Sequence, residues 1–236
     1  MNELKPLAFK SKKKVVKRLD RLALPMLFQD MAFQNPDKNC RLCPRLAEFR
    51  DTNAEKFPDK FNAPVPAFGD LDAEVLIVGL APGLKGANFT GRPFTGDYAG
   101  DLLYETLLKF GLAKGRYAKH KDDSLELVGV RITNAVRCVP PENKPTTEEM
   151  NTCRPFLIDE IAAMPNLKTI ISLGLVSHNA VLKTFGHKIS AFKFAHHVRH
   201  QIQETITLID SYHCSRYNTQ TRRLTGAMFE EIFKDL

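Results

Sequence analysis

Long apolar runs are missing from this 236-residue chain, and their absence excludes whole classes of protein. No segment approaches the roughly 20 apolar residues that a membrane-spanning helix needs. The basic stretch 10–14 is followed by neither an apolar core nor a small-residue cleavage site, so no secretory leader is expected. The chain also lacks internal repeats and low-complexity tracts. These absences predict a cytoplasmic protein that does not associate with membranes.

Acidic residues are in the minority, because 34 Lys and Arg face 27 Asp and Glu and leave a net charge of +7. The isoelectric point is correspondingly about 9.1. A polyanionic partner such as nucleic acid fits this balance. Many ordinary soluble proteins are mildly basic too, so the charge alone leaves the partner open and says nothing about chemistry.

Short apolar runs alternate with helical patterns after residue 72. Strands are expected at 74–79, 128–133, 168–173 and 205–210. Helices are expected at 100–110, 146–163, 176–185 and 226–233, the second of them with a capping pattern at its head. This order predicts a three-layer α/β/α fold with a central, mainly parallel four-stranded sheet. Ligands of such sheets bind beyond the carboxyl ends of the strands.

No nucleotide-binding signature accompanies the glycine-rich loop after the first expected strand. Residues 79–97 hold five glycines, which let backbone N–H groups approach a ligand closely. Neither G-x-x-x-x-G-K-[ST] nor G-x-G-x-x-G occurs there, so the loop does not match a known phosphate cradle.

Four segments resemble, in the right order, the motifs of the family 5 uracil-DNA glycosylases: 64–70, 79–97, 133–145 and 213–225. The resemblance covers about residues 40–226. It implies a monofunctional DNA repair glycosylase, expected to be a monomer, that hydrolyses the N-glycosidic bond of uracil in DNA and leaves an abasic site. It leaves open whether other deaminated or modified bases are substrates. The alternative is a catalytically weak or inactive iron–sulfur DNA-binding module.

The start of the glycine loop offers no ionisable side chain. The second position of G-x-x-P-G, acidic in family 4 enzymes, is Leu80, and the third, a catalytic Asp in the common bacterial and human enzyme, is Ala81. The needed carboxylate is therefore expected from Asp97, although Asp97 also suits the N-cap of the following helix. The resemblance makes His213, just past the fourth strand, the group that hydrogen-bonds the departing base.

Recognition of the base is assigned to residues at the ends of the first two strands. An amide offers a donor and an acceptor on one fork, as needed to read N3–H and O4 of uracil, and Asn134 supplies one. A turn-forming Asn is the alternative. Phe94 is expected to stack on the base, beside the loop start Gly79, Leu80 and Ala81.

Cysteines occur in an odd number, so a disulfide framework is not indicated. Four of them suit a structural zinc or an iron–sulfur cluster: Cys40, Cys43, Cys138 and Cys153. The family resemblance implies a 4Fe-4S cluster. It would staple the basic N-terminal segment 1–70 to the rest of a single glycosylase domain spanning 1–236. A separate histidine group, His196, His197 and His200, lacks an acidic partner at metal spacing and is expected on the surface.

Basic side chains around these motifs are expected to contact DNA phosphates near the extruded nucleotide: Lys85, Arg92, Arg216, Arg222 and Arg223. The resemblance implies that Ser215, Arg216 and Asn218 bind DNA in a loop that enters the minor groove beside that nucleotide. The last motif departs from the family at Cys214, where Pro is usual, and at Tyr217 and Arg222, where Gln and Gly are usual. These departures put the rigidity of the loop and the rate in question rather than the reaction.

Overall fold

The computed structural model describes residues 33–234 and 236, so the basic stretch 10–14 lies outside the described part. Within that part, no helix is long and apolar enough to cross a membrane. The first described helix, α1 (Pro44–Lys56), starts with proline, whose fixed φ suits a first helical turn.

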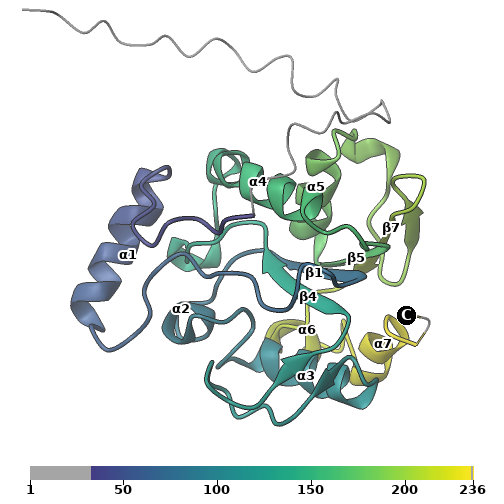
Figure 1. Cartoon of the computed structure of the whole chain (residues 1–236), viewed down its shortest axis with the longest axis horizontal. Coiled ribbons are helices and arrows are strands. Elements are labelled where there is room, and N and C mark those ends of the chain that lie inside the picture. Colours follow the sequence, from purple (N-terminus) through teal and green to yellow (C-terminus); the bar gives the residue numbers. More distant parts are fainter. Residues whose placement is uncertain (1–32, 235) are drawn as a thin grey trace, which may run out of the picture. The chain divides into compact units, whose positions relative to one another are not determined.

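The central sheet contains the four expected parallel strands and one that the sequence did not indicate (Figure 1). Its order is β4-β1-β5-β7-β6, with β1 Val75–Gly79, β4 Val130–Asn134, β5 Thr169–Leu173 and β7 Thr207–Ser211 in parallel. The additional strand is β6 (Arg199–Gln201), which pairs antiparallel with β7. Three polar, half-exposed residues carry no apolar run, so β6 gives no signal in the sequence.

Helices cover both faces of this sheet and complete the expected α/β/α layers (Figure 1). On one face α3 (Tyr98–Lys109) and α7 (Gly226–Glu231) pack on one core with Ile77, Ile132 and Ile209. On the other, α4 (Thr147–Ala162) and α5 (Leu175–Thr184) pack on a second core with Leu76, Ile170 and Leu208. The alternation of strand residues between two apolar cores explains why the strands read as continuous apolar runs.

Short elements and connectors close the ends and edges of the sheet. They are α2 (Ala87–Thr90), the hairpin β2 (Ala113–Lys114) with β3 (Glu126–Leu127), α6 (Arg216–Gln220), and the 3-10 turns η2 (Pro141–Asn143) and η3 (Ile189–Ala191). The connector before β1 pairs Phe68 with Ile132 of the edge strand β4 through two backbone hydrogen bonds of 2.9 and 2.7 Å.

The register of the strands sets the position of the functional loops. Gly79, the last residue of β1, pairs with Asn134, the last of β4, and Leu173 of β5 pairs with Ser211 of β7. Four carboxyl ends therefore meet at one edge of the sheet. The loops that leave this edge contain the motifs singled out above.

Candidate active site and cysteine cavity

A pocket lies beyond the carboxyl ends of β1, β4 and β7, and we call it the strand-end pocket. Its volume is about 650 Å³, within the ~300–1,000 Å³ of typical small-molecule sites, and it is open to solvent. Its lining brings together side chains that are far apart in the sequence: Leu80, Ala81, Phe94, Asp97, Asn134 and His213. The catalytic and base-binding residues expected from the sequence therefore gather in one place, with Gly79 directly beside them.

Gly79 is required because two of these side chains press against its backbone. A Cβ atom at this position would clash with Oδ1 of Asn134 and would lie 2.6 Å from Cζ of Phe94. The missing side chain thus lets the amide and the aromatic ring approach the end of β1. The backbone of Gly79 thus contacts both the Asn134 amide and the Phe94 ring and helps to position them.

Phe94 occupies a backbone conformation that ordinary side chains avoid. Its φ is +51°, and non-glycine residues held there cost about 1–3 kcal/mol, a strain that is typical of ligand sites. The ring is 7% exposed and lies 6.1 Å from the His213 ring, centroid to centroid, at 31°. The first turn of α3 supports this loop, because a Cβ on Gly100 would overlap the Phe94 carbonyl oxygen.

Asp97 forms the helix cap that its sequence position suggested, and its carboxylate also lines the pocket. Its Oδ1 accepts a hydrogen bond of 3.0 Å from the Gly100 N–H and so caps α3. Its Oδ2 lines the pocket beside Gly86, where a Cβ would clash with the carboxylate. Burial raises the pKa of the Asp97 carboxyl, while the Gly100 N–H opposes that shift.

His213 faces the pocket as a neutral imidazole. Burial lowers the pKa of His213 to about 4, because desolvation disfavours the charged ring. The amide of Asn218 donates to the His213 carbonyl at 2.8 Å, and Ser215 caps α6 by accepting from the Asn218 N–H. Both polar side chains thus hold the histidine loop in shape.

Cys214, which follows His213, is fully buried and donates its S–H to the Ala99 carbonyl at 3.4 Å. This thiol ties the histidine loop to the first turn of α3. The residue at the position of the family's usual proline is therefore part of a buried packing contact.

Asn134 is 3% exposed, yet no described residue forms a hydrogen bond with its side-chain amide. Buried amides are normally satisfied, so this one is available to a ligand. Asn143, in η2, also lines the pocket with a φ of +57°. Asn143 belongs to the motif 133–145, but no role was expected for it from the sequence.

The rim of the pocket carries the exposed cations Lys85 and Arg216, and the exposed Arg222 and Arg223 follow α6. The Arg216 guanidinium lies 5.4 Å from the Tyr98 ring centroid, and that of Arg223 lies 4.7 Å from the Tyr212 centroid. Stacking on a ring restricts these long side chains while their charge stays in solvent. The rim therefore offers positive charge directly around the pocket mouth.

Arg92 does not belong to this rim, which corrects the expectation that it binds phosphate. Its side chain is 4% exposed and pairs with both carboxylate oxygens of Asp123, at 2.6 and 2.9 Å. The guanidinium also lies 5.0 Å from the Phe68 ring centroid. Because Arg92 is buried and paired with Asp123, it anchors the glycine-rich loop, residues 79–97, to the segment that contains Asp123.

The four expected cysteines line a second, mostly enclosed cavity, which we call the cysteine cavity. Cys40 and Cys43 precede α1, Cys138 follows β4, and Cys153 lies in α4. The remaining lining is largely apolar and includes Leu46, Val136 and Phe156. The fold thus gathers thiols that are separated by more than a hundred residues.

The four sulfurs do not form a preorganised metal site. A tetrahedral zinc with Zn–S bonds of about 2.3 Å holds its sulfurs about 3.8 Å apart. Among the described residues, three or more ligand atoms lie within 4.8 Å of one another at His178, His200 and Asp210, but not at these cysteines.

Two buried arginines place positive charge next to the cysteine cavity. Arg50 donates to Sγ of Cys138 at 3.5 Å and to the Cys40 carbonyl at 3.0 Å. Arg137 is 1% exposed and pairs with Glu160, yet its Nε and Nη1 have no partner among the described residues. Glu160 is shared with Arg131, so the local charge is in excess. Orphaned N–H groups beside four thiols fit an anionic, thiolate-bound group.

Of the three histidines expected on the surface, His197 is exposed, whereas His196 and His200 are half-buried and contact neighbouring groups. His200 is 12% exposed and approaches Asp210 at 3.2 Å, so it has the acidic partner that the sequence did not reveal. His196 contacts the Met228 carbonyl and the Tyr212 N–H. Asp210 lies ten residues beyond His200 on the neighbouring strand, a contact that only the β6–β7 pairing creates.

Comparison with known proteins agrees with this geometry. The family model of the uracil DNA glycosylase superfamily matches residues 66–236. The chain is 43% identical to a type-5 uracil-DNA glycosylase of Thermus thermophilus over 201 residues, which are 83% of this chain and 91% of the relative. A type-5 enzyme of Pyrobaculum aerophilum is 38% identical, over 86% of this chain and 89% of the relative.

A type-4 uracil-DNA glycosylase of Pyrobaculum aerophilum is also 38% identical, but over only 64% of this chain and 63% of the relative. The longer type-5 matches agree with the non-acidic Leu80 and Ala81 at the start of the loop. With the family model covering most of the chain and the motifs meeting in one pocket, the protein belongs to the uracil DNA glycosylase superfamily.

Proposed function

We propose that this protein removes uracil from DNA by hydrolysing the bond between the base and its sugar. The observation that carries the proposal is the strand-end pocket, where an unpartnered buried amide, a buried carboxylate and a neutral imidazole face one space. The names of its type-5 relatives point to the same activity. The reaction is excision that leaves an abasic site, the first step of base excision repair.

The base must leave the helix before it can enter the pocket. Unstacking costs about a few kcal/mol, and less at a mispair. In the pocket, Phe94 supports one face of the ring, and Asn134 reads O4 and N3–H. Cytosine presents a 4-amino group and a bare N3, the reverse pattern, so one amide orientation separates the two pyrimidines.

Bond cleavage places positive charge on the sugar and negative charge on the departing uracil. The Asp97 carboxylate lies where it can stabilise the sugar cation and orient the attacking water. Neutral His213 can donate a ring N–H to the uracil anion, aided by backbone N–H groups of the Gly79 loop. Charges and dipoles fixed before the reaction are typically the largest catalytic contribution. No lysine is assigned to Schiff-base chemistry, so no strand-cleaving step is included.

Cys40, Cys43, Cys138 and Cys153 are proposed as the ligands of one 4Fe-4S cluster. The four cysteines that line one cavity and the orphaned N–H groups of Arg137 support an anionic cluster there. When bound, the cluster would supply a covalent crosslink between the segment before α1 and the strand-helix core, and no electron transfer is needed. On this proposal residues 1–236 form one domain, with 1–70 fastened to it by the cluster.

DNA is proposed to lie across the rim, with Lys85, Arg216, Arg222 and Arg223 near phosphates, and Ser215 and Asn218 shaping the loop between them. Phosphate contacts carry no sequence information, so little dependence on flanking sequence is expected. The protein is proposed to act as a monomer in the cytoplasm, because the pocket needs no second chain for its lining.

An excision assay tests the function directly. A labelled duplex with one uracil opposite guanine is incubated with iron-loaded protein and then treated with alkali. Alkali-dependent cleavage at the uracil position is expected, with an intact strand before alkali. Binding of this duplex without any release of uracil would instead favour the alternative, an inactive iron–sulfur DNA-binding module.

A further inference from the structure

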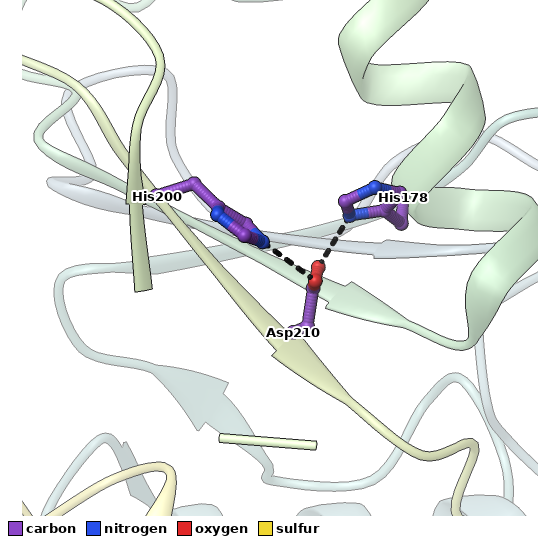
Figure 2. Close-up of side chains that lie close together, drawn as sticks. All are labelled: His178, His200 and Asp210. Atoms are coloured by element: carbon purple, nitrogen blue, oxygen red, sulfur yellow. Dashed lines mark hydrogen bonds and ion pairs between the residues drawn. The ribbon is translucent and has the colours of Figure 1, made fainter. Parts of the chain in front are cut away.

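A group of buried side chains on the far side of the sheet has no part in the proposed reaction (Figure 2). His178 of α5 and His200 of β6 both point at the Asp210 carboxylate of β7. Their side chains are 0%, 12% and 0% exposed, in the order His178, His200, Asp210. We call this group the His–Asp cluster. It joins α5 to the neighbouring strands β6 and β7.

The two nitrogens of the His178 ring face only acceptors. Nε2 lies 3.1 Å from the Phe192 carbonyl oxygen, and Nδ1 lies 2.7 Å from Oδ1 of Asp210. A neutral imidazole has one N–H and one lone pair, and the carbonyl can only accept. The remaining nitrogen then presents a lone pair to a carboxylate oxygen. This contact is attractive only if a cation, either a proton or a metal ion, lies between them.

His200 completes a set of three convergent ligand atoms. Its Nε2 is 3.2 Å from Oδ2 of Asp210, and all three ligand atoms lie within 4.8 Å of one another. The His178 and His200 ring centroids are 5.6 Å apart. Two imidazoles on one tetrahedral zinc have centroids about 5 Å apart, from Zn–N bonds of about 2.0–2.1 Å. The rings are therefore already near the spacing of a shared ion.

The surroundings resemble those of a protein metal site. Metal-bound histidines usually donate their other N–H to a carbonyl or carboxylate, which is the contact between His178 and Phe192. Ser172 donates to Oδ1 of Asp210 at 2.8 Å and orients the carboxylate. The Phe194 and Phe192 rings pack edge-on against His178 and His200, and so exclude solvent.

From this geometry we propose that His178, His200 and Asp210 bind one zinc-class divalent ion, separate from the cysteine cavity and the strand-end pocket. Two imidazole nitrogens and one carboxylate oxygen are a ligand set that zinc accepts, and water on the His200 side supplies the fourth ligand. Binding widens the contact between Nδ1 and Oδ1 from 2.7 Å to about 3.3 Å, the edge of a zinc tetrahedron. The ion joins α5 and β6 to β7 at Asp210, three residues before His213.

Metal content and cobalt binding test the proposal in the full-length, iron-loaded protein. His200→Gln removes one ligand from the more accessible side, and His187→Gln is the matched control. His187 is half-buried and packs on the same Phe192 ring, but its Nε2 contacts the Ile202 carbonyl outside the cluster. Wild type and control are expected to retain about one zinc per chain after dialysis, and His200→Gln close to none.

Titration with Co²⁺ after zinc removal gives a second readout. Wild type and His187→Gln are expected to develop the visible d–d bands of tetrahedral cobalt with nitrogen and oxygen ligands, without added sulfur-to-cobalt charge transfer. Zinc should also raise the melting temperature of these two proteins and leave that of His200→Gln unchanged, because only a bound ligand stabilises the fold. Excision at moderate temperature should remain the same in all three.

Equal zinc and cobalt binding by wild type and His200→Gln would overturn the proposal. The proposal would also be overturned if wild type bound neither zinc nor cobalt, since a proton would then be the cation between His178 and Asp210. All three proteins contain the same cysteines, so zinc in an iron-poor cysteine cavity cannot produce the expected difference.

Discussion

The strand-end pocket and the cysteine cavity both contain buried polar groups without a partner among the described residues, but their surroundings differ. In the pocket the unpartnered group is the Asn134 amide, and the space is open to solvent. In the cavity it is the Arg137 guanidinium, surrounded by thiols and apolar side chains and with an excess of positive charge. Polar groups without a partner favour a ligand at each of the two sites. The open pocket suits a ligand that exchanges with solvent, whereas the enclosed cavity suits a ligand that stays bound.

The largest expected effect is on the pocket side of this comparison. Asp97→Asn should keep DNA binding but lower single-turnover excision by about a hundredfold or more, because it removes a preorganised charge from a developing cation. Asp101→Asn is the control, since Asp101 lies one turn further along α3 in an exposed ion pair with Lys119. Wild-type rates in Asp97→Asn would mean that another group, such as Asn143, holds the water.

Removing one thiol tests whether the cysteine cavity holds the cluster. Cys138→Ser should lose most of its iron and lower the free energy of unfolding by several kcal/mol, roughly the cost of losing a structural metal. Cys214→Ser should retain its iron, because Cys214 contacts Ala99 and not the cavity. Iron content, visible absorption and melting temperature provide the measurements. Stoichiometric zinc in wild-type protein, with no iron, would contradict the cluster.

A smaller effect should show whether His213 stabilises the departing uracil anion or only positions the nucleotide. His213→Ala is expected to slow excision of uracil about ten times more than that of 5-fluorouracil, since a better leaving group needs less stabilisation of its anion. The ratio of the two single-turnover rates is the measurement. An equal loss for both bases would show that His213 positions the nucleotide.

The same histidine predicts a pH dependence of stability. Burial lowers the pKa of His213 to about 4 from an ordinary value near 6.5. Between those two values the unfolded chain binds a proton that the folded chain does not, so stability should fall as pH falls through this window. Urea unfolding at several pH values should show a shallower fall in His213→Gln. An identical slope in both proteins would mean that the ring is not desolvated.

The smallest effect concerns the rim. Arg216→Ala should weaken binding to all DNA sequences alike and reduce the slope of log affinity against log salt by about one unit. Lys109→Ala is the control, because Lys109 ends α3, whose other end is at the pocket. An unchanged slope in Arg216→Ala would place DNA elsewhere than on this rim.

Sequence reasoning succeeded where local patterns and spacing determine the structure. Apolar runs gave all four parallel strands to within about two residues, and the cap signals at Thr146 and Asp97 were both confirmed. It failed where partners come from distant segments. Arg92 looks like a phosphate ligand until Asp123, thirty-one residues away, buries it. His200 looks solvent-exposed until the pairing of β6 with β7 places it beside Asp210.

The edges of the sheet carry a consequence for behaviour at high concentration. An exposed edge strand offers unpaired backbone groups that can recruit another chain. Here Phe68 pairs with Ile132 at the β4 edge, and the other edge is β6, which is only three residues long and bears the charged Arg199. Neither edge presents a long flat row of free donors and acceptors. Edge-to-edge aggregation of the native protein is therefore disfavoured, even with a core built of parallel, apolar strands.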